Sequence, residues 1–292
     1  MEIVSLRPNV WVLRGGVNLG ALVAEGEVFF VDAGLDEGPA RRLWRWAEER
    51  GLRPRAAVLT HAHADHFGGA HFWEAQGLPL WAPPLEAAMM RHPLLEPLFL
   101  FAGASPHPEL LAKFTLARPI PTVRPLGEKA EELLPLKVVP LPGHAPEQVG
   151  VAVNGVLFCA DALFTPEILA KHPIPFCHDV AQALKSLDGL GEHEVVVPGH
   201  GAPLEGAAVR AAVQAFRTRL LDLLEETEKA LSTPRSGEEL VGFLAQRFGA
   251  QNLNLVGFLL ARTTVYALLS FLVREGRAEA FLENGVLLWR GK

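Results

Sequence analysis

The chain has 292 residues, 49% of them hydrophobic, and a formal net charge of −6 at pH 7. This length can bury a full core and allows one or two domains. The negative charge argues against a dedicated polyanion binder, whose affinity comes mainly from Lys and Arg that neutralise phosphates. No apolar run reaches the roughly 18 residues that a membrane helix needs. Because residues 1–7 also lack a basic segment followed by an apolar one, we expect a cytoplasmic protein without a signal peptide or a membrane partner.

The first part of the chain predicts β-hairpins that lead into an alternation of strands and helices. Gly-containing turns separate strand-like runs over residues 10–13, 19–23 and 28–31. An amphipathic helix is expected over residues 38–50, with Leu43, Trp44 and Ala47 facing inward. Such an arrangement favours two mixed sheets packed face to face, with helices outside.

A dense group of potential metal ligands follows the next strand-like run, residues 56–59. The segment reads His61-Ala-His63-Ala-Asp65-His66 and precedes Gly68-Gly69, a pair that can turn the backbone. Alternate residues of an extended or looped segment project to the same side, so His61 and His63 can share one ion while Asp65 and His66 reach another. That pattern indicates a hydrolase with two metal ions.

Three further donors lie downstream, each after a short apolar run that is typical of a buried strand. They are His144, Asp161 and His200. Loops at strand ends are where sites are commonly built.

The order HxHxDH, His, Asp, His over roughly residues 1–205 resembles the metallo-β-lactamase superfamily, in particular its glyoxalase II-like branch. The resemblance implies an α/β fold, a four-layer αββα sandwich of two mixed β-sheets with the ligands along one edge. It implies one metal ion held by His61, His63 and His144. A second ion would be held by Asp65, His66 and His200, with Asp161 bridging the two. Imidazole and carboxylate donors suit Zn²⁺ best here, while iron and manganese are alternatives.

The expected function is a metal-dependent hydrolase whose metal-bridging hydroxide attacks a small ester, thioester or lactone with an apolar acyl part. Asp65, His66 and Asp161 would be its catalytic residues, and Asp65 could also orient the hydroxide. The chemistry would resemble that of hydroxyacylglutathione hydrolase, with the natural substrate left open. Asp32, at the end of a strand-like run, matches the family's Asp-x-Gly element. It is expected to orient a ligand histidine as a hydrogen-bond acceptor, or else only to form a turn.

Residues that differ from those of known family members narrow the range of possible substrates. The best-known class B β-lactamases carry Arg in place of His66 and Cys in place of Asp161, and the similar lactonases carry Tyr where this chain has Phe164. Glyoxalase II enzymes grip glutathione with Tyr and basic residues, whereas the only Tyr here, Tyr266, lies in a different helical pattern. β-Lactam and glutathione substrates are therefore disfavoured. A mononuclear iron dioxygenase remains an alternative, because such members keep much of the same motif.

Two apolar segments, residues 84–125 and 163–178, are expected to wall a substrate pocket, although the first could instead be a helical pair that packs or dimerises. Cys159 is expected to be a small buried hydrophobe. Cys177 is not expected to act as a nucleophile, since the metal site supplies one.

The pattern becomes helical in residues 206–292, a predicted second domain after a catalytic domain over 1–205. Three short helices, one capped by Ser236 and Glu239, precede a hairpin turned at Asn284-Gly285, which looks like a winged helix. The favoured role of this module is packing or contacts within a homodimer, with the module also edging the active site. The alternative is a single-strand endoribonuclease, in which nucleic acid would meet an exposed face formed by Thr263, Thr264, Tyr266, Arg262, Arg274 and Arg277.

Overall fold

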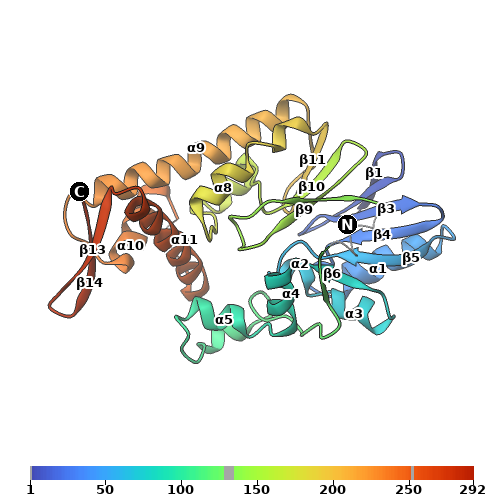
Figure 1. Ribbon diagram of the computed structural model, residues 1–292, viewed down its shortest axis with the longest axis horizontal. Coiled ribbons are helices and arrows are strands. Elements are labelled where there is room, and N and C mark those ends of the chain that lie inside the picture. Colours follow the sequence, from blue (N-terminus) through green and yellow to red (C-terminus); the bar gives the residue numbers. More distant parts are fainter. Residues whose placement is uncertain (1, 128–134, 251–252) are drawn as a thin grey trace.

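The computed structural model describes residues 2–127, 135–250 and 253–292. Within them, two mixed β-sheets pack face to face and helices cover both outer faces (Figure 1), as the sequence predicts. The first sheet holds, in spatial order, β1 (Glu2–Arg7), β2 (Val10–Arg14), β3 (Leu19–Ala24), β4 (Glu27–Val31), β5 (Arg53–Val58), β6 (Leu80–Ala82) and β7 (Arg124–Pro125). Strands β1 to β4 are antiparallel, and β4 to β7 are parallel.

The second sheet places three ligand-bearing strand ends at one edge. Its spatial order is β12 (Leu204–Glu205), β11 (Val195–Pro198), β10 (Val156–Ala160), β9 (Val149–Val153) and β8 (Lys137–Pro140). Strands β10 and β11 are parallel, and β9 is antiparallel to both β8 and β10. Because β8, β10 and β11 therefore run in the same direction, their carboxyl ends meet on one side of the sheet.

The space between the sheets is filled by branched and aromatic side chains that alternate along the strands. Val12, Phe29 and Val58 of the first sheet belong to the same buried cluster as Val151 and Phe158 of the second. Period-2 alternation puts one face of each strand into this layer and the other under a helix. Nearly continuous apolar strands such as β10, which is buried along its whole length, follow from burial on both faces.

Helices α1 (Glu37–Glu48), α3 (Ala70–Ala75) and α4 (Pro84–Arg91) cover the outer face of the first sheet. Of the predicted inward residues of α1, Leu43 and Ala47 are buried, and Trp44 packs against the same core while remaining partly exposed. Trp46 is buried as well, since it follows Leu43 by three residues and shares its face. Trp44 is only half-buried, and its indole N–H donates to Glu48 at 2.8 Å.

The outer layer of the second sheet is continuous with the C-terminal part of the chain (Figure 1). Helices α7 (Pro166–Lys171) and α8 (Val180–Ser186) and the 3-10 turn η2 (Leu190–Glu192) are followed by the long helix α9 (Ala207–Ala230). One buried cluster runs from Leu157 in the sheet through Phe216 of α9 to Leu268. The C-terminal helices therefore share a hydrophobic core with the second sheet.

The C-terminal part contains α9, α10 (Gly237–Phe248), α11 (Leu255–Arg274) and the hairpin β13 (Ala278–Glu283) and β14 (Val286–Gly291). Three helices and a terminal hairpin are present as expected, but the prediction that all three helices are short is wrong, since α9 has 24 residues and α11 has 20. The predicted cap of α10 is confirmed: Ser236 Oγ accepts from Glu239 N–H at 3.2 Å, and Ser236 N–H donates to Glu239 at 2.7 Å.

Helix α11 is long and apolar enough to cross a membrane by length and composition alone, a property that core helices of soluble proteins share. Arg262 interrupts its apolar residues, and Val265, Leu268 and Leu272 are completely buried against the rest of the protein. The helix thus contributes to the core of this structure.

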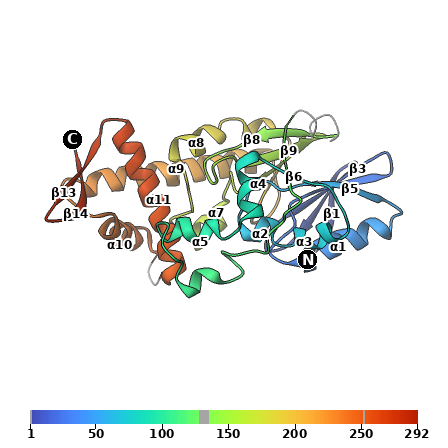
Figure 2. The same ribbon diagram turned by 60° about the horizontal axis from the view of Figure 1, so that its bottom comes forward.

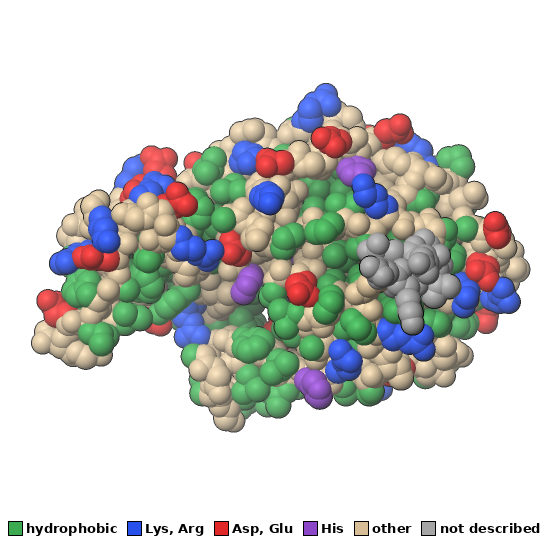
Figure 3. Space-filling view, in the orientation of Figure 1, with side chains coloured by type: hydrophobic (Ala, Val, Ile, Leu, Met, Phe, Trp, Pro, Cys, Tyr) green, Lys and Arg blue, Asp and Glu red, His purple; other side chains and the backbone are tan. Residues whose placement is uncertain are grey.

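A small separate cluster connects α11 to the segment after β6. Leu100 of α5 (Leu95–Leu100) and Leu110 of the 3-10 turn η1 (Pro108–Leu111) pack on Leu259 of α11. Both ribbon views place α5 beside α11 (Figure 2), and the space-filling view shows a notch between the C-terminal lobe at the left and the lobe below it (Figure 3).

Candidate metal centre

All seven predicted metal-ligand side chains come together at the edge where the two sheets meet. His61, His63, Asp65 and His66 lie after β5, the last two on the short helix α2 (Ala64–Phe67), and the second sheet contributes the rest. Those from the second sheet are His144, Asp161 and His200, which follow β8, β10 and β11. Donors far apart in sequence thus converge because the carboxyl ends of their strands share one edge.

The first group of donors consists of three imidazoles. His63 Nδ1 lies 3.1 Å from His61 Nε2 and 2.8 Å from His144 Nε2. Three ring nitrogens this close together suit a common cation, which would accept all three lone pairs.

The second group combines imidazole and carboxylate donors, and Asp161 lies between the two groups. His200 Nε2 is 3.3 Å from Asp65 Oδ2 and 3.5 Å from Asp161 Oδ2. Asp161 Oδ2 also lies 3.5 Å from His144 Nε2, while Asp161 Oδ1 lies 3.3 Å from His66 Nε2. The Asp161 carboxylate therefore faces both groups, as a bridging ligand would.

The ring nitrogen opposite the cluster is fixed by a hydrogen bond in four of the five histidines. His66 Nδ1 lies 2.8 Å from Asp32 Oδ2, and Thr60 Oγ1 lies 3.1 Å from His61 Nδ1 and donates to the same Asp32 oxygen at 2.9 Å. His144 Nδ1 faces the Phe176 carbonyl at 3.1 Å, and His200 Nδ1 faces the Gly16 carbonyl at 2.7 Å. Such outer contacts point the remaining nitrogen at a metal ion. Asp32 is thus the orienting acceptor that the sequence suggested.

Two atoms of the cluster show how well a cation would fit. His66 Nε2 and Asp161 Oδ1 are fully buried and have no hydrogen-bond partner among the described residues; their 3.3 Å separation lacks hydrogen-bond geometry. Buried polar atoms left unpaired are costly. A divalent ion coordinated by both atoms would remove that cost, and the imidazole and carboxylate donors are of the type that Zn²⁺ takes.

The two groups differ in their protonation. Burial and the neighbouring His144 lower the pKa of His63 to about 3, and burial with His66 nearby lowers the pKa of His61 well below its usual range. Burial also opposes the charged form of His200, but the charge of Asp161 and the close contacts with the Asp161 and Asp65 carboxylates raise its pKa to about 10. Likewise, Asp161 and Asp32 outweigh burial and raise the pKa of His66. The first group is therefore neutral and the second carries protons that a metal ion must displace.

Glycine is required where a ligand loop passes close to another element. A Cβ on Gly199 would overlap the Asp161 carboxylate and come within 2.9 Å of the His66 ring, and one on Gly143 would overlap the backbone of Ala183. As expected, the Gly68-Gly69 pair forms the turn between α2 and α3, with φ angles of −55° and −77° that any residue could adopt. These two glycines allow close contact with the carbonyls of Leu35 and Ala33.

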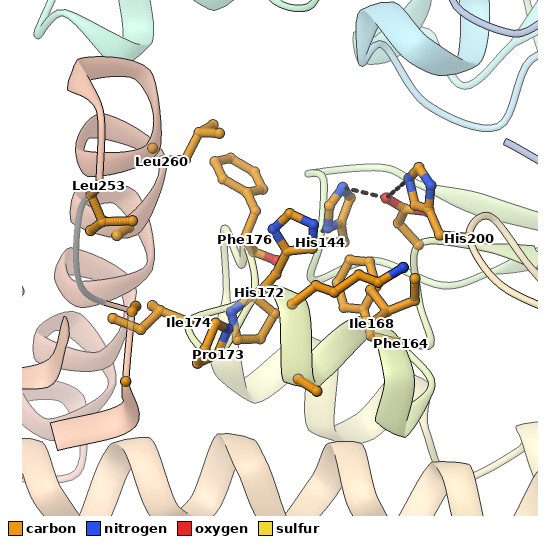
Figure 4. A pocket seen from close by; sticks show the side chains of 18 residues that line it. His144, Phe164, Ile168, His172, Pro173, Ile174, Phe176, His200, Leu253 and Leu260 are labelled. Atoms are coloured by element: carbon orange, nitrogen blue, oxygen red, sulfur yellow. Dashed lines mark hydrogen bonds and ion pairs between the residues drawn. The ribbon is translucent and has the colours of Figure 1, made fainter. Parts of the chain in front are cut away.

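A cavity of about 480 Å³ opens onto His144, Asp161 and His200 (Figure 4). One wall comes from the predicted segment 163–178, and the opposite wall comes from α11 and the residues before it, in agreement with the expectation that the C-terminal module edges the active site. The labelled apolar side chains are Phe164, Ile168, Pro173, Ile174, Phe176, Leu253 and Leu260. Residues 84–125 do not line this cavity; through Leu100 and Leu110 they pack on α11. The structure therefore shows this segment packing on α11, which was the alternative expectation for it.

Of the nucleic-acid face outlined from sequence, Thr264 is buried, whereas Arg274 and Arg277 are exposed. Thr264 is completely buried, where its hydroxyl donates to the Pro175 carbonyl at 3.0 Å and accepts from Cys177 N–H at 3.1 Å. The three arginines already have protein partners: Arg262 donates to the Leu100 carbonyl, Arg274 pairs with Asp179 and Arg277 pairs with Glu228.

Both cysteines are buried, which confirms the expectation for Cys159. Burial and the nearby Asp179 raise the pKa of Cys177 to about 12, and burial also raises the pKa of Cys159. A thiol held in its neutral form is a poor nucleophile.

Sequence comparison agrees with the geometry. The family model described as "Metallo-beta-lactamase superfamily" matches residues 12–200. A probable metallo-hydrolase of Bacillus subtilis is 32% identical over 144 residues, covering 48% of this chain and 54% of that protein. A hydroxyacylglutathione hydrolase of Xanthomonas euvesicatoria is 28% identical over 197 residues, covering 64% and 61%. The matched regions thus span little more than half the length of these curated relatives.

Solved structures extend the likeness to the C-terminal helices. A metallo-beta-lactamase family protein from Thermus thermophilus superposes with a TM-score of 0.74 at 25% identity, covering 99% of this chain and 100% of that one. A beta-lactamase domain protein from Burkholderia ambifaria shares the fold with a TM-score of 0.75 at 23% identity, covering 100% of this chain and 94% of that one. With its family match over most of the chain and a cluster of histidines and aspartates able to bind metal, this protein belongs to the metallo-beta-lactamase superfamily.

Proposed function

We propose that this protein is a dinuclear metallohydrolase that cleaves a small ester, thioester or lactone with an apolar acyl part. The observation that carries the proposal is the apolar cavity that ends at His144, Asp161 and His200 (Figure 4). The hydroxyacylglutathione hydrolases among its relatives favour acyl transfer to water as the reaction class.

Two divalent ions, Zn²⁺ by the donor set, would activate water and polarise the substrate carbonyl. His61, His63 and His144 would hold one ion, and Asp65, His66 and His200 the other, with Asp161 shared. Asp65 has a side chain that is 29% exposed, whereas that of Asp161 is 6% exposed. The Asp65 carboxylate can therefore also accept a hydrogen bond from the attacking water and orient it toward the acyl carbon.

The cavity walls favour an acyl group without charge. Phe164 and Phe176 stand beside the His144 ring with centroids 5.6 Å and 5.3 Å away. Beyond them the two walls are aliphatic, and burying an acyl chain there gains free energy in proportion to its apolar area. Lys171 and His172 also line the cavity, so its polar groups outside the metal centre are few, as is usual for pockets that fix one orientation.

The leaving group is not glutathione in this proposal. Tyr266, the chain's one tyrosine, packs edge-on against Trp289 with ring centroids 6.1 Å apart and against Gly237, away from the cavity lining. A β-lactam is disfavoured as well, because His66 and Asp161 occupy positions where the best-known class B enzymes carry Arg and Cys.

The test is turnover of matched acyl substrates by the metal-reconstituted enzyme. Butanoyl and hexanoyl p-nitrophenyl esters and the corresponding acyl thioesters should be hydrolysed, and Asp161→Ala should lose most of this activity together with at least one metal ion. Cys177→Ala is the control, and its rate should stay near that of the wild type because the buried thiol takes no part. Loss of activity in Cys177→Ala with both metals retained would overturn the mechanism.

A further inference from the structure

One buried carboxylate lies directly behind the metal centre and contacts two of its loops. Glu86, in the first turn of α4, is 1% exposed. Its Oε2 accepts from Ala62 N–H at 2.9 Å and its Oε1 accepts from Glu147 N–H at 3.0 Å. Among the described residues no Lys, Arg or His forms an ion pair with it. Buried acidic side chains without a cationic partner are rare and costly, so this carboxylate needs an explanation.

The two N–H donors belong to the loops that carry the three-histidine group. Ala62 lies between His61 and His63, and Glu147 lies three residues after His144. The first loop follows β5 of one sheet, and the second follows β8 of the other. Glu86 therefore joins the ligand loops of the two sheets through a single side chain.

Other contacts hold α4 in the place that this bridge requires. Leu85 N–H donates to Glu147 Oε2 at 2.7 Å, and Val149 N–H donates to the Thr60 carbonyl at 3.1 Å. The bond from Leu85 ties the start of α4 to the loop after β8. The bond from Val149 ties that loop to the loop after β5. Because the Glu86 carboxylate accepts hydrogen bonds only from backbone N–H groups, it fixes the backbone of the two loops rather than the rotamer of a side chain.

A second carboxylate lies on the same side. Glu96 of α5 has a side chain that is 13% exposed, and its Oε1 lies 3.9 Å from His63 Nε2. Imidazole binds a metal ion as a neutral ligand, so charge that balances a divalent ion at that group has to come from neighbouring carboxyl groups. The other group already contains Asp65.

We propose that Glu86 is a positioning residue for the ion held by His61, His63 and His144, fixing both ligand loops at once. The inference rests on the metal assignment of the proposed function. It concerns one of the two ions and leaves the group of Asp65, His66 and His200 unaffected.

Glu86→Gln is the sharpest variant because it keeps the shape of the side chain. The amide has one acceptor oxygen in place of two, so its NH₂ group must face either Ala62 N–H or Glu147 N–H, and one loop loses its bond. Glu147→Gln is the matched control: the same change is made in the loop that Glu86 contacts, at an exposed side chain that keeps an oxygen for Leu85 N–H.

The experiment titrates chelator-treated, metal-free protein with Zn²⁺ in competition with a chromophoric chelator, which resolves two binding steps without using activity. His144→Ala identifies the step that belongs to the three-histidine group. In Glu86→Gln that step should weaken at least tenfold while the other changes less than twofold, and Glu147→Gln should match the wild type. Adding Glu86→Gln to His144→Ala should leave the remaining step as it is in His144→Ala alone.

Equal weakening of both steps, or two steps within twofold of the wild type, would overturn the proposal. If Glu86→Gln does not fold without metal, Glu86→Asp, which keeps the charge but is shorter, should show the same selective loss. A wild-type protein that binds no Zn²⁺ would instead refute the metal assignment itself, so the two failures are distinguishable.

Discussion

Asp32 shows how one side chain organises several ligands. It follows β4 with a left-handed φ of 57° and accepts from the Thr60 backbone, the Thr60 hydroxyl and His66. Through Thr60 it also fixes His61. A single carboxylate thus orients one histidine of each group.

Asp32→Asn is expected to weaken metal binding by roughly 10–100-fold, the usual effect of losing an outer carboxylate contact. Asn tolerates the left-handed backbone, so the fold should persist. Zn²⁺ competition and circular dichroism together check this. Unchanged affinity in a folded variant would show that the contact with His66 is not needed for binding.

The two groups of ligands differ in protonation, so their affinities for a metal ion should depend differently on pH. His200, with its pKa raised to about 10, and His66, also raised, hold protons at pH 7.5, whereas His63, lowered to about 3, does not. A proton competes with the metal for the same nitrogen. Affinity of the second group should therefore rise as the pH increases from about 6.5, the reference pKa of His, toward the raised value.

Calorimetric titrations with Zn²⁺ at pH 7.5, in buffers of different ionisation enthalpy, count the protons released at each step. One step should release more protons than the other, and His200→Ala should release fewer in total than the wild type. Equal release by wild type and His200→Ala would contradict the assigned protonation.

At the level of residues, the sequence predicted side chains whose spacing and position after a strand indicate metal binding. The seven donors and Asp32 stand next to recognisable strand ends, so their convergence could be expected. Glu86 could not be found in this way, because its partners at positions 62 and 147 meet it only after the two sheets pack. Thr264 was wrongly placed on the surface for the same reason: its hydroxyl is buried by the loop at Pro175 and Cys177.

At the scale of elements, α11 edges the active site as expected of the C-terminal module, but its individual wall residues were not predicted. Its periodicity predicts a helix, yet nothing in the pattern shows that Leu260, and Leu253 just before the helix, face the metal centre across the cavity. That contact depends on how the C-terminal helices dock on the second sheet. The hairpin and the α10 cap, by contrast, depend on local signals and were predicted.

If α11 forms half of the acyl pocket, each added methylene of the substrate should raise kcat/KM by up to about fourfold, from burial worth about 0.8 kcal/mol. Leu260→Trp fills part of the cavity and should lower the octanoyl-to-acetyl ratio of kcat/KM at least tenfold. Val273→Trp, at a 39% exposed position of the same helix outside the cavity lining, is the control. An unchanged ratio in Leu260→Trp would place the acyl chain elsewhere.

At the scale of the whole molecule, the metal centre joins the two halves of the sandwich. Four of its donors follow β5 of the first sheet, and three follow strands of the second. Only the folded chain brings them together, so metal binding is linked to folding.

Removal of metal should therefore lower the thermal stability. A free ion at about a thousand times its Kd stabilises the folded state by about 4 kcal/mol, which corresponds to a shift of several degrees in Tm for a chain of this size. Scanning calorimetry with and without chelator checks this. A Tm that does not respond to metal in a protein that binds it would mean that binding does not depend on the folded arrangement.

In the proposed site, seven side chains from both sheets hold two metal ions. Elemental analysis of protein stripped with a chelator, reconstituted with Zn²⁺ and freed of excess metal measures this stoichiometry. We expect two ions per chain in the wild type and a loss of at least one in Asp161→Ala. A wild-type protein that retains at most one ion per chain would contradict this expectation.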